Sequence, residues 1–598
     1  MSVVFLRKFS AVAENIPEAI ATMVLLKAAL SSAAFAYYIK KSLGKSDYGA
    51  AAFGVLYSFC GFFIAYYWNV MWLDAMFLFP LVMLGIERIV NLRKPMLFIG
   101  SMALTMIANY YMAYMVCLFS VIYFFIYFAA NYRLSSLYGE AVFTLDDKGE
   151  KRYSAGQRLR HSVFLGSGLR FAFAALVAFC LAAFALIPLY YILQASSATS
   201  GSFPENYKSY FKIFDFLANH LAGLEPTIRS SGEDVLPNIY CGMATVLLVP
   251  LYLFSKTIQL KEKAAHVILL AILYFSFNIN FANYVWHGFH FPNDLPYRFS
   301  FIYSFVLLVM AYKAFMRLKE YSGKDILAVG IAVVMGIVLV QELGSKNVSE
   351  ATVIISLSFA VLYTLLFAVI KKSPHAASAL CLIMMLSCVT EACIADTWNF
   401  SMNQKKADYA SDLGDFTLLK KGLDAQNTGF YRMELAYLRT RMDPCWYDYN
   451  GASVFSSMAY EKTSNLQSKL GMWSNYINSY TYYPQTPVYN MMNAIQYLVD
   501  NDENYEPNPE FYRSLMSKGK FTAYENKYCL PVAYCASTVL GAWNHISDNP
   551  FEVQGDYFEK ATGVSGVFDR IPITDSYYYN VDEMYSGFDT GQFYYYKT

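Results

Sequence analysis

The stretch "WHGFHFPNDLPYRFSF" at residues 286–301 places several chemically capable side chains inside a strongly apolar chain. Arg298 can clamp a phosphate through two parallel hydrogen bonds. Asp294 is a carboxylate that can act as a general base, and it lies four residues before Arg298, a spacing that allows pairing across one helical turn. The other polar groups in the stretch are Asn293, His287 and His290. We predict either a binding site here or a structural Asp294–Arg298 pair at the start of a helix.

The two histidines leave a second alternative open. His287 and His290 are three residues apart, which suits two metal ligands on one face, with Asp294 as a third. Histidines that only form hydrogen bonds within a loop are the other interpretation. No Walker A motif, HExxH or dinucleotide-binding GxGxxG accompanies them. A divalent metal is therefore the one cofactor that the sequence leaves open.

Two further polar stretches interrupt apolar runs. "WNVMWLDAMFLFP" (68–80) contains Asp74, which can either activate a hydroxyl or cap the helix that begins there. "ANYYMAY" (108–114) contains Asn109, Tyr110 and Tyr111 at a tight turn between two apolar segments. Lys27 lies in the middle of "ATMVLLKAALSS", where we expect a buried carboxylate partner. Polar groups at membrane depth cost several kcal/mol unless they are paired or hydrated, so all of these are functional candidates.

The elements that position these residues are membrane helices. The chain has 598 residues, of which 56% are hydrophobic and 15% charged, against about 25% charged in soluble proteins. Runs of roughly 20 apolar residues predict about twelve membrane segments. They lie near 17–38, 48–66, 71–87, 95–109, 112–130, 168–193, 238–255, 264–280, 297–316, 325–341, 352–370 and 375–393.

After residue 395 the composition changes to Tyr, Asn, Asp and Ser, without another apolar run of that length. The predicted fold class is a polytopic α-helical membrane protein with a C-terminal mixed α/β soluble domain. We expect a multi-pass transmembrane domain over 1–395 and the soluble domain over 396–598. The net charge of +1 argues against a nucleic-acid partner.

Lys and Arg alternate between the connecting segments. They gather in 40–45, 87–94, 131–167, 256–263, 313–324 and 371–372, and are sparse in 67–69, 109–111, 195–237, 281–296 and 342–351. The positive-inside rule makes the first set cytoplasmic. It therefore places Asp74, Asn109–Tyr111 and residues 286–301 at the outer leaflet of the membrane, with the C-terminal domain outside.

The same orientation puts the N-terminal residues outside without a recognisable signal peptide, which leads us to expect a fragment of a longer protein. Cys529 and Cys535 are close together in the soluble domain. A disulfide between them is one alternative, and two free thiols are the other.

Several motifs together resemble the YfhO family of bacterial membrane proteins. They include "YSFCGFFIAYYWNVMWLDAMFLFPLVMLGIERI" (57–89), "LPNIYCG" (236–242) and "LPYRFSFIYSFVLLVMA" (295–311). In the soluble part they include "FYRMEL" (430–435), "GASVFSS" (451–457) and "AYENKYCLP" (523–531). The resemblance runs over nearly the whole chain.

That family is similar to the GT-C integral membrane glycosyltransferases. The resemblance implies inverting transfer of a sugar from a polyprenyl-phosphate carrier to a cell-surface acceptor of the teichoic or lipoteichoic acid type, with membrane lipid as the setting. Such enzymes carry their principal catalytic Asp in the first outer loop, after a first helix, and this chain looks as if it begins beyond both. The remaining candidates are Asp74 and Asp294 as catalytic carboxylates, with Asn109, Tyr110, Tyr111, His287, His290, Asn293 and Arg298 as substrate-binding residues.

Two other function classes fit many helices with polar residues. One is a transporter or flippase for lipid-linked sugar or cell-wall polymer, and the other is a scaffold whose outer domain binds that polymer. A transporter is expected to keep polar residues along the full depth of its helices. This chain concentrates them at one leaflet, which favours the enzyme.

Overall fold

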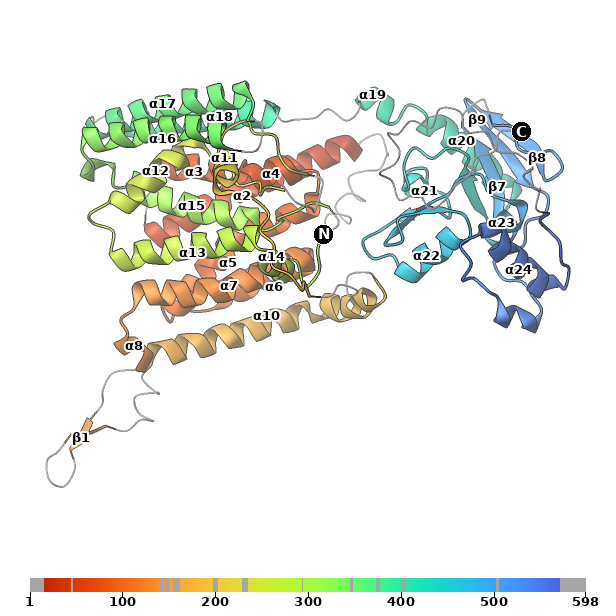
Figure 1. Cartoon of the computed structure of the whole chain (residues 1–598), viewed down its shortest axis with the longest axis horizontal. Coiled ribbons are helices and arrows are strands. Elements are labelled where there is room, and N and C mark those ends of the chain that lie inside the picture. The colour runs from red at the N-terminus through yellow and green to blue at the C-terminus, as the bar shows by residue number, and fades with distance from the viewer. Residues whose placement is uncertain are drawn as a thin grey trace. The chain divides into compact units, whose positions relative to one another are not determined.

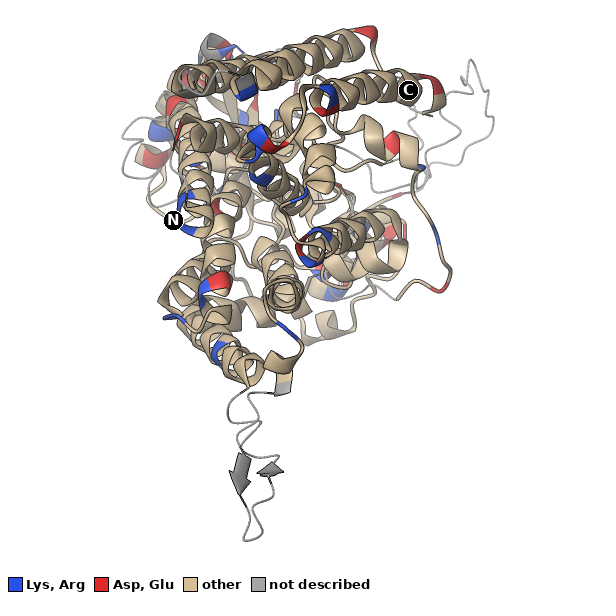
Figure 2. Cartoon of the chain, turned by 90° about the vertical axis from the view of Figure 1, so that its left-hand side faces the viewer, with Lys and Arg blue, Asp and Glu red and all other residues tan. Residues whose placement is uncertain are grey.

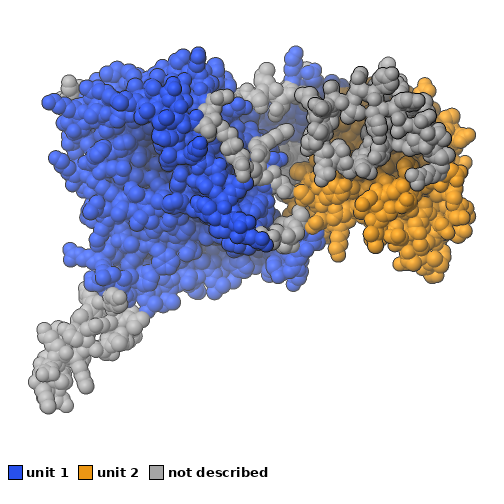
Figure 3. All heavy atoms as spheres, in the orientation of Figure 1, with its two compact units in different colours: residues 1–411 blue, residues 412–598 orange. Residues whose placement is uncertain are grey.

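The computed structural model describes most of the chain, and contacts divide it into two units, residues 1–411 and 412–598 (Figure 3). The described residues are 16–44, 47–138, 143–145, 151–153, 162–196, 203–228, 235–292, 294–344, 348–372, 377–398, 405–501 and 505–569. Asn293 lies outside them.

Unit 1 is a bundle of long helices (Figure 1). Eight helical segments within the described residues are long and apolar enough to cross a membrane. They are α2 (Ile16–Leu43), α3 (Tyr48–Ser58) joined to α4 (Gly61–Tyr66), η2 (Val70–Trp72) joined to α5 (Leu73–Val90), α7 (Tyr110–Asn131), α10 (Val163–Gln194), α16 (Gly323–Leu343), α17 (Glu350–Lys372) and α18 (Ala377–Trp398). The chain is therefore a multi-pass helical membrane protein, as predicted.

Helix is present in all of the twelve predicted segments, but four of them differ from full spans. Helices α6 (Met96–Ala108), α12 (Met243–Phe254) and α15 (Ser300–Phe315) are 13, 12 and 16 residues long. Helix α13 (Leu260–Asn278) begins with the charged residues "LKEK". The smaller elements of this unit are α8 (Ser135–Tyr138), β1 (Phe143–Leu145), β2 (Lys151–Tyr153), α11 (Ile213–Ala218), α14 (Asn280–Trp286), η4 (Leu318–Glu320) and α19 (Lys406–Tyr409).

Helix α15 lies at the centre of the bundle, and nearly all of its residues are buried. Its Phe305 ring meets Phe35 of α2 and Phe79 of α5 edge-on, with ring centroids 5.5 and 5.0 Å apart. Such edge-to-face pairs add to the burial of apolar area. Because α15 packs against both α2 and α5 through Phe305, the segment that leads into it lies near the start of α5.

Figure 2 looks along the helices onto the end of unit 1 that carries α8, and Lys and Arg mark the ends of several helices there. Lys40 and Lys41 close α2, Arg88 lies in the last turn of α5 and Lys313 in that of α15. The residues of the polar stretches, by contrast, lie where α5, α7 and α15 begin.

Unit 2 is a mixed α/β fold, as predicted. Its main sheet has the order β3-β7-β9-β8, in which β3 is parallel to β7 and the other neighbours are antiparallel. These strands are β3 (Arg432–Leu435), β7 (Ile495–Asp500), β8 (Tyr512–Lys518) and β9 (Phe521–Asn526). The apolar face of α20 (Leu413–Gln426) covers the sheet, with Phe416 fully buried against Phe521.

A second sheet of three short strands has the order β4-β6-β5. The remaining elements of unit 2 are β4 (Val454–Phe455), β5 (Trp473–Ser474), β6 (Ser479–Thr481), α21 (Asp443–Trp446), α22 (Glu461–Lys469), α23 (Pro487–Met492), η6 (Thr538–Ala542) and α24 (Pro550–Thr562). The buried Glu434 carboxylate of β3 connects two motifs of this unit. It accepts hydrogen bonds from the main-chain N–H groups of Ala452 and Ser453 and from the Tyr449 hydroxyl.

Candidate functional site

The Arg298 guanidinium lies between two aromatic rings. Its Cζ is 4.8 Å from the centroid of the Trp72 ring and 4.7 Å from that of the Tyr111 ring. Its Nε donates to the Leu295 carbonyl at 3.0 Å, and Nη2 donates to the Asp294 carbonyl at 3.0 Å. Stacking and two main-chain acceptors therefore hold the cation in one place, and a planar guanidinium is suited to such stacking.

The loop before α15 has an unusual backbone. Phe289, Leu295 and Tyr297 all have positive φ, at 63°, 62° and 52°, a region that costs non-glycine residues free energy and clusters at functional sites. Two buried tyrosines anchor the loop. Tyr66 donates to the Pro296 carbonyl at 2.6 Å, and Tyr297 donates to the Val235 carbonyl at 3.1 Å.

This backbone corrects the predicted Asp294–Arg298 helical pair. Helix α15 begins at Ser300, so neither residue lies on it. Left-handed residues at Leu295 and Tyr297 rule out a regular turn between them. Arg298 instead bonds to the main-chain carbonyl of Asp294, whose side chain is exposed.

Lys27 of α2 and Asp74 of α5 form an ion pair with 2.7 Å between Nζ and Oδ1. Both side chains are nearly buried, at 10% and 14% exposure. Lys27 also donates to the Val70 carbonyl at 2.9 Å. The expected buried carboxylate partner of Lys27 is thus confirmed, and it is Asp74.

Asp74 does not cap its helix through its side chain. The N-cap residue of α5 is Trp72, which makes no side-chain cap hydrogen bond, and Asp74 lies in the first turn beyond it. The stretch from Val70 to Asp74 therefore contacts both cations. Val70 and Asp74 hold Lys27, and Trp72 stacks on Arg298.

Tyr111 joins this group to the two histidines. Its ring centroid lies 5.7 Å from that of His290 and 6.5 Å from that of His287. The Tyr111 hydroxyl and His287 Nε2 are buried, and neither has a hydrogen-bond partner among the described residues. Buried polar atoms are nearly always paired, so these two atoms have hydrogen-bonding capacity left for a further polar group.

Asn109 and Tyr110, at the turn before α7, form structural contacts. Asn109 caps α7, since its side-chain oxygen accepts from the Met112 N–H at 3.0 Å. The Tyr110 ring packs edge-on against Tyr111 at 6.3 Å. Asn109 therefore fixes the direction in which α7 starts and presents Tyr111 to Arg298.

The histidines are neutral near pH 7. Burial, reinforced by the Arg298 charge, lowers the pKa of His287 to about 3, and the same two causes lower the pKa of His290. His287 Nδ1 lies 2.9 Å from the Asn283 carbonyl, so the proton sits on Nδ1 and Nε2 is an acceptor.

The metal alternative does not fit this geometry. Within the part of the chain that the structure describes, no three His, Cys, Asp or Glu side chains lie close enough to hold a metal ion. A nearby guanidinium also disfavours a second cation. The described residues therefore do not form the alternative His287–His290–Asp294 ligand set, in which His287 is buried and Asp294 is exposed.

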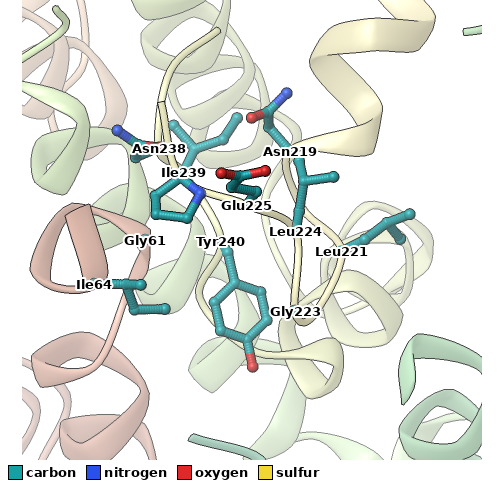
Figure 4. A pocket seen from close by; sticks show the side chains of 11 residues that line it. Gly61, Ile64, Asn219, Leu221, Gly223, Leu224, Glu225, Asn238, Ile239 and Tyr240 are labelled. Atoms are coloured by element: carbon teal, nitrogen blue, oxygen red, sulfur yellow. The ribbon is translucent and has the colours of Figure 1, made fainter. Parts of the chain in front are cut away.

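A separate small pocket lies where the "LPNIYCG" motif meets Gly61 (Figure 4). Glu225 and Asn219, from the segment between α10 and α12, line it. Val235 of the same segment instead contacts the loop before α15, through the Tyr297 hydroxyl. A Cβ on Gly61 would lie 2.9–3.0 Å from main-chain atoms of Asn238, Ile239 and Tyr240, which is why the chain has glycine there.

Sequence reasoning missed Trp72 as a site residue. The sequence did contain a feature that could have indicated Trp72. It is a tryptophan two residues before Asp74, in a segment that otherwise consists mainly of residues such as Leu and Phe. In the soluble unit, Cys529 and Cys535 are free thiols.

Fold and site together define a multi-pass membrane protein with an appended α/β unit and a polar, aromatic-walled cluster at one end of its helices. A family described as bacterial membrane protein YfhO matches residues 1–587, and the chain belongs to this family.

The curated relative "Uncharacterized protein YfhO" of Bacillus subtilis (strain 168) is 22% identical over 528 residues. That match covers 85% of this chain and 55% of the relative, so the chain spans about half of the relative's length. Among solved structures, apo ArnT from Cupriavidus metallidurans is similar, with 11% identity, a TM-score of 0.38, and coverage of 89% of this chain and 87% of that one. A TM-score this low does not support transfer of fold or function.

Proposed function

We propose that this chain is part of a membrane glycosyltransferase that moves a sugar from a polyprenyl-phosphate carrier to a cell-surface polymer, of the teichoic or lipoteichoic acid type, on the outer face. The observation that carries the proposal is the stacked Arg298 cation beside the Lys27–Asp74 pair. Support also comes from the family's resemblance to GT-C enzymes.

In this proposal Arg298 binds the carrier phosphate. A guanidinium has five N–H groups, and two of those of Arg298 donate to main-chain carbonyls. The others can donate to phosphate oxygens. The Tyr111 hydroxyl donates to the same phosphate or to the sugar. His287 Nε2, neutral and buried, accepts from a sugar hydroxyl and so helps to orient the ring.

Asp74 is the carboxylate that takes the proton of the acceptor hydroxyl. Attack of that oxygen on the sugar's anomeric carbon forms the new glycosidic bond, and the bond to phosphate breaks, so that the polyprenyl phosphate leaves with both electrons. Lys27 holds the Asp74 carboxylate in place through their ion pair. Asp294 acts through its main-chain carbonyl, which orients Arg298.

The test is sugar transfer to the surface polymer in cells that carry Arg298 variants in the whole protein. Arg298→Ala should abolish transfer while membrane insertion and abundance stay normal. Arg298→Lys keeps the positive charge but loses the paired guanidinium N–H donors and the stacking on the two rings. It should retain only a few per cent of the parent protein's sugar transfer. Unchanged transfer in Arg298→Ala would remove the phosphate role.

The second candidate, a transporter or flippase for lipid-linked sugar or polymer, is favoured by one observation. Glu87, near the opposite end of α5 from Asp74, is buried and accepts from Tyr38, Ser42 and Tyr123 at 2.6, 2.6 and 2.9 Å. A transport role predicts that Glu87→Gln lowers translocation of the lipid-linked sugar in proteoliposomes. An enzyme predicts that this variant changes stability alone.

A further inference from the structure

The small sheet of unit 2 exposes an aromatic face. Phe455 pairs with Ser479, and Trp473 pairs with Thr481. Directly opposed residues share a face, and Ser479 and Thr481 are two apart, so all four side chains lie on the same side. Phe455 and Trp473 are 46% and 49% exposed.

Arg441 crosses this face. Its Cζ is 4.2 Å from the centroid of the Trp473 ring, and its Nη1 donates to the Ser479 hydroxyl at 3.1 Å. No carboxylate among the described residues forms an ion pair with Arg441, whereas Arg513 in the same unit pairs with Glu525. Arg441 is therefore a half-buried cation without an ion-pair partner in the described part of the chain.

The face also contains a second incomplete polar group. The Thr481 hydroxyl, on the same side as Arg441, is buried and has no hydrogen-bond partner among the described residues. A contact that served only to fasten residues 439–442 to β5 would not need an unpaired charge, a half-exposed indole and an unpaired hydroxyl together.

We propose that the Trp473–Arg441 face binds a glycan chain that carries phosphate or carboxylate groups. Flat aromatic side chains pack well against sugar rings, and a guanidinium binds phosphate or carboxylate through paired hydrogen bonds. Charge complementarity selects an anionic glycan over a neutral one. That this glycan is the acceptor polymer of the transfer reaction rests on the proposed function.

The test is binding of defined polymers to the full chain in neutral-lipid nanodiscs. The probes are a sugar-substituted poly(glycerol phosphate), a uronic acid polymer and neutral dextran, each of matched length. We expect one or both anionic polymers to bind and dextran to bind at least tenfold more weakly. Whichever anionic polymer binds identifies phosphate or carboxylate as the recognised group.

Three variants locate the binding. Trp473→Ala and Arg441→Ala should each weaken binding at least tenfold, while Trp473→Phe, which keeps a flat ring, should stay within threefold of the parent. Phe430→Ala is the matched control, because Phe430 is 60% exposed with Arg432 6.0 Å above its ring and precedes β3 of the main sheet, outside the three-stranded sheet, and it should not change binding. A normal thermal unfolding curve is required of each variant.

Equal binding of dextran, or unchanged binding by Trp473→Ala and Arg441→Ala, would overturn the proposal. So would loss of binding to vesicles of anionic phospholipid in these variants without loss of polymer binding, since that would identify the face as a membrane contact. Arg298→Ala separates the two proposals. Intact polymer binding with lost transfer supports both, and intact transfer would remove the phosphate role of Arg298 while the glycan face stands.

Discussion

The Lys27 ammonium of α2 and the Asp74 carboxylate of α5 are 2.7 Å apart and only 10% and 14% exposed. They form a buried ion pair that connects the first described membrane helix to the stretch that stacks on Arg298. The pair is therefore a structural contact that joins α2 to the stretch beside the proposed phosphate site.

Replacing one partner of the Lys27–Asp74 pair should lower the stability of the fold strongly, and replacing both should lower it much less. Lys27→Met or Asp74→Leu alone leaves a buried charge unpaired and should lower stability by about 3–5 kcal/mol, whereas the double variant should recover most of the loss. Thermal unfolding in detergent measures this. Lys420→Met is the control, because the Lys420–Asp424 pair is partly exposed and should contribute about 0.5 kcal/mol or less. A double variant as unstable as the singles would contradict the pairing.

Asp74→Asn separates structure from chemistry. The amide keeps the size of the side chain but cannot take a proton, so we expect sugar transfer to fall at least a hundredfold. The double variant Lys27→Met, Asp74→Leu should be folded and inactive. Normal transfer by that double variant would assign the pair to packing alone.

Tyr111→Phe should leave the fold intact and weaken function. The Tyr111 hydroxyl is buried without a partner among the described residues, so its removal should not destabilise the protein. The phenyl ring keeps the stacking on Arg298. We expect sugar transfer to fall about tenfold through weaker donor binding, seen as a raised KM for the lipid-linked sugar. A lower unfolding temperature with unchanged KM would place the hydroxyl outside the site.

Gly61 and Gly100 give a matched pair of glycine-to-alanine changes. A Cβ at Gly61 would lie 2.9–3.0 Å from the main chain of residues 238–240, so Gly61→Ala should destabilise by about 1–3 kcal/mol. A Cβ at Gly100, inside α6, meets nothing within 4 Å. Gly100→Ala should therefore stabilise by about 0.5–1 kcal/mol. Unfolding temperatures in detergent that shift in the same direction would contradict the close contact at Gly61.

Glu434 should make the stability of unit 2 depend on pH. Burial, only partly offset by its hydrogen bonds, raises the pKa of Glu434 to about 7 from the ordinary 4.5. The folded unit therefore holds more protons than the unfolded one between these values, and its stability should fall as pH rises from about 4.5 to 7. The loss is about 3 kcal/mol at most. Glu434→Gln should flatten this dependence in unfolding scans across that range, and an unchanged slope would point to other groups.

The sequence predicted those features that depend only on the length of apolar runs and on the polarity of single side chains. Apolar run length predicted helix at each described membrane segment, and a lysine inside an apolar run predicted that Lys27 needs a carboxylate. Helix boundaries were harder to place, because α15 begins at Ser300 rather than at Tyr297.

The backbone conformation of the loop before α15 could not be predicted from the sequence, for a physical reason. Phe289, Leu295 and Tyr297 adopt left-handed conformations that their side chains disfavour in isolation. Tertiary contacts such as the Tyr66 hydrogen bond to Pro296 impose them. Local preference therefore pointed to a helical Asp294–Arg298 pair, and packing produced a guanidinium stacked between Trp72 and Tyr111. The choice of Asp74 as the partner of Lys27 depended on packing in the same way.

Helix α10 is longer than the hydrocarbon core of a bilayer is thick. At 32 residues it is about 48 Å long, while a hydrocarbon core is about 30 Å thick. Arg170 near one end and the exposed Tyr190 near the other are the kinds of side chain that settle at lipid headgroups. The helix between them rises about 30 Å, so the excess length lies in the headgroup layers or is absorbed by tilt. In a thinner membrane α10 would have to tilt further, and its packing against α6 would change with the lipid.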